Sequence, residues 1–225
     1  PLEERERREH GGWVRGLLGG KLEPLLKGAA ACLCGNRYLQ DYALRLCENS
    51  ILLPTVVDTT VYAPREDGRG GSMAIGWMGS PSTWANVRPL LPVLSRLCTE
   101  HRAEFRVVGA GAAAERDRFP GMTPIEWTEA DEVAEVRRMD IGIMPLADGP
   151  FQRGKSGYKL IQYMACGLPV VASPVGANRD SAADGESGLS APSPAEWTVA
   201  LSNLLADAAL RKRMGEAGRR RAVSD

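Results

Sequence analysis

Residues 154–173 read Gly-Lys-Ser-Gly-Tyr-Lys-Leu-Ile-Gln-Tyr-Met-Ala-Cys-Gly-Leu-Pro-Val-Val-Ala-Ser. The stretch predicts a helix at 157–166, which ends at Gly167, and then a buried strand at 169–173. At about 100° per residue, apolar positions share one side of this helix: Gly157, Leu160, Ile161 and Met164. Polar side chains share the opposite side: Lys155, Lys159 and Gln162. The helix is therefore predicted to have an apolar back and a cationic, hydrogen-bonding front.

This cationic front begins at the expected start of the helix. Gly154 and Gly157 leave backbone N–H groups accessible, and a helix N-terminus carries about half a positive charge. Lys155 and Lys159 add point charges at the same place. The arrangement suits a bound diphosphate, and the alternative is a solvated face on an ordinary helix.

Strand and helix patterns alternate along most of the chain. Strands are expected at 73–78, 104–108, 123–127, 140–145, 169–173 and 188–191. Helices are expected at 84–100, 129–138, 157–166 and, in two pieces, 194–222. This alternation predicts a doubly wound parallel sheet of the Rossmann-like α/β class. Ahead of it, strands at 29–34 and 50–57, with a helix at 37–48 capped by Asn36, predict part of a second α/β domain.

Composition excludes several classes of function. Among 225 residues, 44% are apolar and the formal net charge is zero, so no chain-wide positive field attracts nucleic acid. Five cysteines and two histidines favour free buried thiols over a disulfide framework or a metal site. No apolar run is long enough to span a bilayer and no signal peptide is evident, so we expect a cytoplasmic protein. Residues 1–28 are expected to be helical, with peripheral association at the inner face of a membrane as the alternative.

Residues 159–176, Lys-Leu-Ile-Gln-Tyr-Met-Ala-Cys-Gly-Leu-Pro-Val-Val-Ala-Ser-Pro-Val-Gly, carry a family resemblance. Together with Asp184-Gly185 and Gly188-Leu189, they closely resemble the donor-site signature of retaining glycosyltransferases of the GT-B fold, family four (glycosyl transferases group 1). Further matches are residues 140–146, 204–207 and 213–215. The resemblance runs from about residue 50 to the end of the chain.

The resemblance implies a division of the chain and an activity. Residues 72–225 would form the domain that binds the nucleotide-sugar donor, residues 59–71 a linker, and residues 1–58 the C-terminal remnant of the acceptor-binding domain. The protein would move a sugar from a nucleotide-diphosphate sugar to an acceptor hydroxyl with retention, in glycan or polysaccharide biosynthesis, without a further cofactor. A glycan or lipid-linked acceptor would bind mainly to the N-terminal domain. We therefore interpret the chain as a fragment that can bind nucleotide without necessarily catalysing transfer.

The candidate site residues follow from the resemblance and the strand ends. Lys155 and Lys159 are the candidate catalytic residues, because they can stabilise the charge of the departing diphosphate. Donor binding is assigned to loops at strand ends and to the start of the helix: Gly79, Ser80, Thr83, Gly109, Trp127, Gly154, Ser156, Gly157 and Gln162. Trp127 is a candidate for stacking or backbone contact with the base, and a core tryptophan is the alternative. No metal is expected.

Two departures from the family pattern keep other functions open. Gly154 and Gln162 stand where the family often has glutamates, and the usual Arg and Lys-Gly residues after the first strand are missing. A noncatalytic sugar-nucleotide-binding module is therefore the first alternative. The second is an NAD-dependent oxidoreductase built on Gly109 and Gly111, although too few residues follow them for a full crossover helix.

Overall fold

The computed structural model describes residues 21–65, 71–182 and 185–224. Contacts divide the chain into two units, Pro1–Pro54 and Thr55–Asp225, with one buried cluster among the described residues of the first and two among those of the second. Most of the helical region predicted at 1–28 lies outside the described residues, as do residues 66–70 of the predicted linker. The predicted boundary after residue 58, and the role of the first unit, stay predictions.

The described part of the first unit has short elements: α3 (Leu22–Lys27), β1 (Cys32–Cys34), α4 (Arg37–Ala43) and β2 (Ser50–Leu52). β1 and β2 pair in parallel. The side chain of Asn36 accepts a hydrogen bond from the Leu39 N–H at 2.9 Å, which confirms the predicted cap. The helix predicted to reach residue 48 ends early because the N–H groups of Arg45 and Leu46 bond to carbonyl oxygens three residues back, at Tyr42 and Ala43, instead of four. β2 is likewise shorter than the strand predicted at 50–57.

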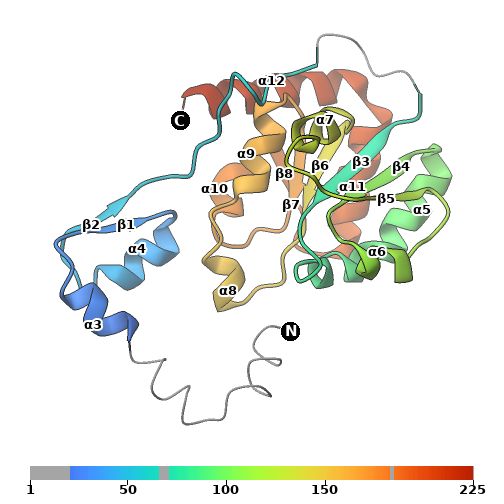
Figure 1. The fold of residues 1–225 in the computed structure, drawn as a ribbon. Coiled ribbons are helices and arrows are strands. Elements are labelled where there is room, and N and C mark those ends of the chain that lie inside the picture. The colour runs from blue at the N-terminus through green and yellow to red at the C-terminus, as the bar shows by residue number, and fades with distance from the viewer. Residues whose placement is uncertain (1–20, 66–70, 183–184, 225) are drawn as a thin grey trace. The chain divides into compact units, whose positions relative to one another are not determined.

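The second unit is built on a sheet with six strands in its described part. They are β3 (Ala74–Met78), β4 (Glu104–Val108), β5 (Met122–Ile125), β6 (Ile141–Met144), β7 (Val170–Ala172) and β8 (Gly188–Ser190). The order across the sheet is β5-β4-β3-β6-β7-β8, and all these neighbours are parallel (Figure 1). The predicted strands are confirmed, with ends shifted by one or two residues, and so is the Rossmann-like α/β class.

Helices connect these strands: α5 (Leu91–His101), α6 (Ala112–Arg116), α7 (Glu132–Arg137), α8 (Pro150–Arg153), α9 (Tyr158–Ala165) and α10 (Asn178–Ala182). Two more, α11 (Pro194–Ala206) and α12 (Ala208–Ser224), follow the last strand. The helix predicted from residue 84 is wrong in its first part. Two 3₁₀ turns, η1 (Trp84–Asn86) and η2 (Arg88–Leu90), precede α5. Pro89 and Pro92 lack the N–H groups that a continuous α-helix would need there.

Side chains on the strands alternate between two buried clusters. Trp77 and Val107 belong to a cluster that α5 and α11 cover, whereas Met78 and Val108 belong to a cluster on α9 and α7. Successive residues of a strand point to opposite faces, so both faces of the sheet are buried. All five cysteines are free and buried, as the sequence predicts.

Tyr163 on α9 separates two strands at the centre of the sheet. β3 and β6 pair at Ile75–Ile141 and Gly76–Gly142, but no pairing is recorded beyond these positions in the described strands. The Met78 N–H instead donates to the Tyr163 hydroxyl at 2.8 Å. Gly142 makes this crossing possible, because a Cβ there would lie 2.4 Å from the Tyr163 ring. The strands therefore diverge toward their carboxyl ends.

Within the second unit, arginine side chains fix the segment that precedes the sheet to helices α7 and α12. Arg219 on α12 donates to the carbonyl oxygens of Thr59, Tyr62 and Ala165 at 2.7–2.9 Å. Arg137 on α7 donates to carbonyl oxygens in the same segment. These bonds hold Tyr62 beside α9 and α7, where its hydroxyl enters the site described next.

Candidate functional site

The site is a pocket at the carboxyl ends of β3 and β6. The chain runs from β3 outward through β4 and β5, and then returns to place β6 on the other side of β3. Open α/β sheets bind ligands at such a switch point. Gly79 after β3 and Pro145 after β6 line the pocket, whose volume of about 500 Å³ suits a small ligand.

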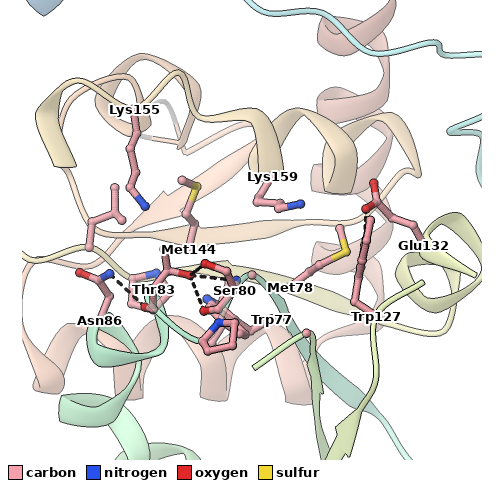
Figure 2. Close-up of a pocket in the computed structure, with 16 residues that line it drawn as sticks. Trp77, Met78, Ser80, Thr83, Asn86, Trp127, Glu132, Met144, Lys155 and Lys159 are labelled. Carbon is pink, nitrogen blue, oxygen red and sulfur yellow. Dashed lines mark hydrogen bonds between the residues drawn. The ribbon is translucent and has the colours of Figure 1, made fainter. Parts of the chain in front are cut away.

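Lys155 and Lys159 enter the pocket from the start of α9. Figure 2 shows Lys155 pointing toward the turn at Thr83, and Lys159 pointing toward Trp127 and Glu132. Burial lowers the pKa of both ammonium groups, and for Lys159 the charge of Glu132 partly offsets this. A bound anion would favour the charged form of both side chains.

The turn after β3 is fixed by its own hydroxyl groups. The Thr83 hydroxyl donates to the Ser80 carbonyl at 2.9 Å and accepts from the Ser80 N–H at 3.1 Å. Gly79 has no room for a side chain, because a Cβ there would lie 2.4 Å from the Trp77 ring. Gly109 after β4 has a φ of +84° and packs on the Gly79 carbonyl. The turn therefore brings its backbone close to the pocket, although the N–H groups of Gly79, Ser80 and Thr83 are bonded within the protein.

Asn86 joins the loops that follow β3 and β6. Its amide nitrogen donates to the Thr83 carbonyl at 3.0 Å, and its amide oxygen accepts from the Ala147 N–H at 3.1 Å. Sequence reasoning missed this residue, because the contact joins positions 61 residues apart.

Glu132 and Trp127 form the other end of the pocket. Trp127 lies just beyond β5 and is 47% exposed, so it is not a core residue. Its indole Nε1 donates to Glu132 Oε2 at 2.5 Å. Glu132, at the start of α7, was not predicted as a site residue. The signal that could have found it is its place, a few residues after a strand, at the edge of the sheet where ligands bind.

Gln162 does not share the exposed front of α9, and this part of the prediction is wrong. Its side chain is fully buried, and its Nε2 donates to Glu132 Oε1 at 2.5 Å and to the Tyr62 hydroxyl at 2.6 Å. The segment at Tyr62 and helix α7 cover this position. Helical periodicity could not foresee either neighbour, because both come from elsewhere in the chain.

The pocket thus brings together many of the predicted site residues: Gly79, Ser80, Thr83, Gly109, Trp127, Lys155 and Lys159. The others are not among the lining residues: Gly154, Ser156, Gly157 and Gln162. Gly157 precedes α9 with a φ of +75°, a left-handed conformation that favours glycine. Donor contacts of all these residues stay predictions.

Gly109 and Gly111 lead into a short helix. α6 contains five residues, Ala112–Arg116, and is followed by a turn toward Gly121. The sequence predicted too short a crossover for a dinucleotide-binding unit, and the helix is indeed short. Gly109 contributes to the central pocket against Trp127.

These features define a class: a doubly wound α/β domain with a lysine-lined pocket at the switch point of its parallel sheet. The family model for glycosyl transferases group 1 matches residues 72–207. The chain belongs to this family. No curated protein matches the sequence.

Solved structures support the fold. HepE of Anabaena, in complex with UDP and glucose, has a TM-score of 0.74 at 15% identity, over 96% of this chain and 63% of its own. Sucrose-phosphate synthase of Thermosynechococcus elongatus has a TM-score of 0.71 at 18% identity, and the match covers 90% of this chain and 56% of the synthase chain. The C-terminal domain of LpcC, a group 1 glycosyl transferase of Francisella tularensis, has a TM-score of 0.58 at 17% identity, over 75% and 97%. The chain thus spans less than two thirds of the HepE and sucrose-phosphate synthase chains.

Two further properties complete the description of the site and its surroundings. In residues 21–65, 71–182 and 185–224, no group of three or more His, Cys, Asp or Glu side chains is placed to hold a metal ion. No helix in the part of the chain that the structure describes combines the length and apolar character that crossing a membrane requires.

Proposed function

We propose that this protein transfers a sugar, a hexose or a related one, from a nucleotide-diphosphate sugar to an acceptor hydroxyl. The observation that carries the proposal is the convergence of Lys155 and Lys159 with the Gly79–Thr83 turn on one pocket at the switch point. A diphosphate needs cations and hydrogen-bond donors, and this pocket offers the ammonium groups of Lys155 and Lys159 and the hydroxyl group of Ser80 on the turn. HepE, a structural neighbour, was solved with UDP and glucose.

The proposed chemistry asks the protein chiefly to stabilise charge. As the bond between sugar and diphosphate breaks, negative charge grows on the leaving phosphate oxygen. Lys155 and Lys159 would bind that charge, and their partial burial makes each interaction stronger than it would be in water. Both lysine side chains already line the pocket, so the step would need little movement of charge into the site.

Finer parts of the proposal rest on the family resemblance. We propose retention of configuration at the sugar carbon, a role in glycan or polysaccharide assembly, and a cytoplasmic site of action. Residues 72–225 would be the donor domain, and the acceptor would bind mainly to a domain of which residues 1–58 are the last part. This division is supported by the match to HepE, which covers 63% of the HepE chain.

Titration tests the donor site directly. UDP, GDP and ADP are titrated into the 225-residue chain by calorimetry, and one of them is expected to bind. Lys155→Ala and Lys159→Ala should each weaken that binding about tenfold or more, because each removes a charged partner of the diphosphate. Lys212→Ala is the matched control, since Lys212 is highly exposed and outside this pocket. Equal binding by all variants, or tighter binding of NADH than of every nucleoside diphosphate, would contradict the proposal.

A noncatalytic binding module is the second candidate. The absence of a carboxylate at Gly154 and Gln162 favours it. Donor hydrolysis and sugar transfer, measured on the full-length protein, separate the two candidates. An enzyme releases nucleoside diphosphate from its donor, whereas a binding module binds the donor and leaves it intact.

A further inference from the structure

Charge is unevenly distributed along the pocket. Lys155 faces the turn at Thr83, Lys159 lies between, and Glu132 stands beside Trp127 at the other end (Figure 2). Among the residues that the structure describes, Glu132 is the one acidic side chain that lines the pocket. A complementary ligand carries negative charge near Lys155 and hydrogen-bond donors near Glu132.

Glu132 is held in place by donors from three separate segments. Oε1 accepts from the Tyr62 hydroxyl and from Gln162 Nε2, and Oε2 accepts from Trp127 Nε1. Tyr62 is itself fixed through its carbonyl oxygen by Arg219. The carboxylate is therefore oriented before any ligand arrives, which lowers the entropic cost of binding to it.

The surroundings of Glu132 keep it ionised. Burial alone would raise the pKa of this carboxyl, but the hydrogen bonds from Tyr62 and Trp127, with the charge of Lys159, outweigh burial and hold the pKa below its ordinary value. An ionised carboxylate accepts hydrogen bonds and does not donate them. It repels phosphate, so its partner in a ligand is a hydroxyl or N–H group.

The carboxylate has capacity for a further donor. Its two oxygens offer about four acceptor positions, and the protein's donors fill two on Oε1 and one on Oε2. Oε2 is the oxygen bonded to Trp127, whose ring is half-exposed. Because Glu132 lines the pocket and the bonds from Tyr62 and Gln162 go to Oε1, we expect a ligand hydroxyl to bind Oε2 without breaking them.

Gln162 is matched to this carboxylate. Its amide nitrogen donates to Glu132, and its buried oxygen has no hydrogen-bond partner among the described residues. A glutamate at position 162 would place a second negative charge against Glu132, and like charges at this distance cannot both ionise without a large penalty. The negative charge at this end of the pocket is therefore carried by Glu132 on α7 and not by residue 162 on α9.

We propose that Glu132 binds the ribose hydroxyl groups of the donor's nucleoside and so selects for ribonucleotides. The inference rests on the proposed function, which places the diphosphate at Lys155 and Lys159. In a nucleoside diphosphate the ribose lies next to the phosphates, and the base lies beyond it. The half-exposed ring of Trp127 offers a flat surface there for the base, which favours the ribose over the transferred sugar as the partner of Glu132.

The test compares ligands with and without ribose hydroxyls. The tightest binder among UDP, GDP and ADP is titrated beside its 2′-deoxy and 3′-deoxy counterparts and inorganic pyrophosphate. Wild-type protein should bind at least one deoxy counterpart about tenfold more weakly, because a carboxylate built to accept a hydroxyl loses its partner. Glu132→Gln should bind the ribonucleotide about tenfold more weakly, discriminate less than twofold against the deoxy ligands, and bind pyrophosphate as wild type does.

Matched variants separate binding from folding. Glu129→Gln makes the same change on an exposed residue outside the pocket, and it should leave every affinity unchanged. Gln162→Glu should lower the melting temperature at pH 7, because it opposes two carboxylates. The double variant Gln162→Glu with Glu132→Gln should recover the melting temperature, because it again has one carboxylate. It should not recover discrimination against the deoxy ligands, because that carboxylate then stands at position 162, which does not line the pocket.

The outcomes distinguish this inference from the proposed function. If no nucleoside diphosphate and no pyrophosphate binds, the proposed function fails and this inference fails with it. If ribonucleotide binds but wild type accepts both deoxy counterparts within twofold, or the double variant recovers full discrimination, the role of Glu132 is overturned and the donor site stands.

Discussion

Replacing Tyr163 with phenylalanine should destabilise the second unit without changing its fold. The Tyr163 hydroxyl accepts the N–H of Met78 at a position where β3 has no recorded pairing with β6 among the described strands. Tyr163 is fully buried and Met78 is 2% exposed, so Tyr163→Phe leaves a buried N–H without its partner. The cost of such a group is about 1–3 kcal/mol.

The expected loss is about 2 kcal/mol, which lowers the melting temperature of a unit of this size by roughly 4–8 °C. Urea unfolding followed by the fluorescence of the buried Trp77 and Trp84 measures it, with an unchanged dependence on urea concentration as the sign of an intact fold. Tyr158→Phe is the control, because Tyr158 begins the same helix but is 37% exposed. A Tyr163→Phe loss no larger than that of Tyr158→Phe would refute the reasoning, since the Met78 N–H would then be satisfied by other means.

Three further predictions concern the same region. Gly142→Ala should cost about 1–3 kcal/mol in the same urea assay, since its Cβ would lie 2.4 Å from the Tyr163 ring; wild-type stability would show that α9 can move away. Because the folded state lowers the pKa of Glu132, its ionised form stabilises the protein above the ordinary value of 4.5, and this contribution is lost as the pH falls through the lowered pKa. The stability difference between wild type and Glu132→Gln should therefore shrink on acidification from pH 7 to pH 4, and a constant difference would contradict this. Arg219→Ala should speed proteolytic cleavage at residues 59–65 several-fold, since it removes bonds to the Thr59 and Tyr62 carbonyl oxygens, whereas the exposed Arg220→Ala should not.

The sequence predicts the sheet well because its strands are short apolar runs buried on both faces. Val107 and Val108 point to opposite sides and both lie in buried clusters, so the run is apolar throughout. Glycines at strand ends also predict the pocket wall, because a turn that has no room for a side chain selects glycine, as at Gly79. α6, α8 and α10 have four or five residues each, too few for a periodic pattern.

The polar end of the pocket could not be predicted in the same way. Tyr62, Glu132 and Gln162 come together from segments up to 100 residues apart, and none carries a local pattern that points to the others. Gln162 shares a helical stripe with Lys159, yet it is buried by neighbours that its own helix does not specify. Periodicity describes one helix at a time, whereas a network of side chains depends on the whole fold.

The packing of Tyr163 against Gly142 implies that the pocket forms when the protein folds, before any ligand binds. β3 and β6 diverge because the buried side chain of Tyr163 bonds to β3 and packs over Gly142, which has no side chain. The cavity is thus a product of folding itself, and a ligand does no work to part the strands. A ligand should then bind to a preformed site, and its association rate should be limited by diffusional encounter rather than by a preceding rearrangement of the protein.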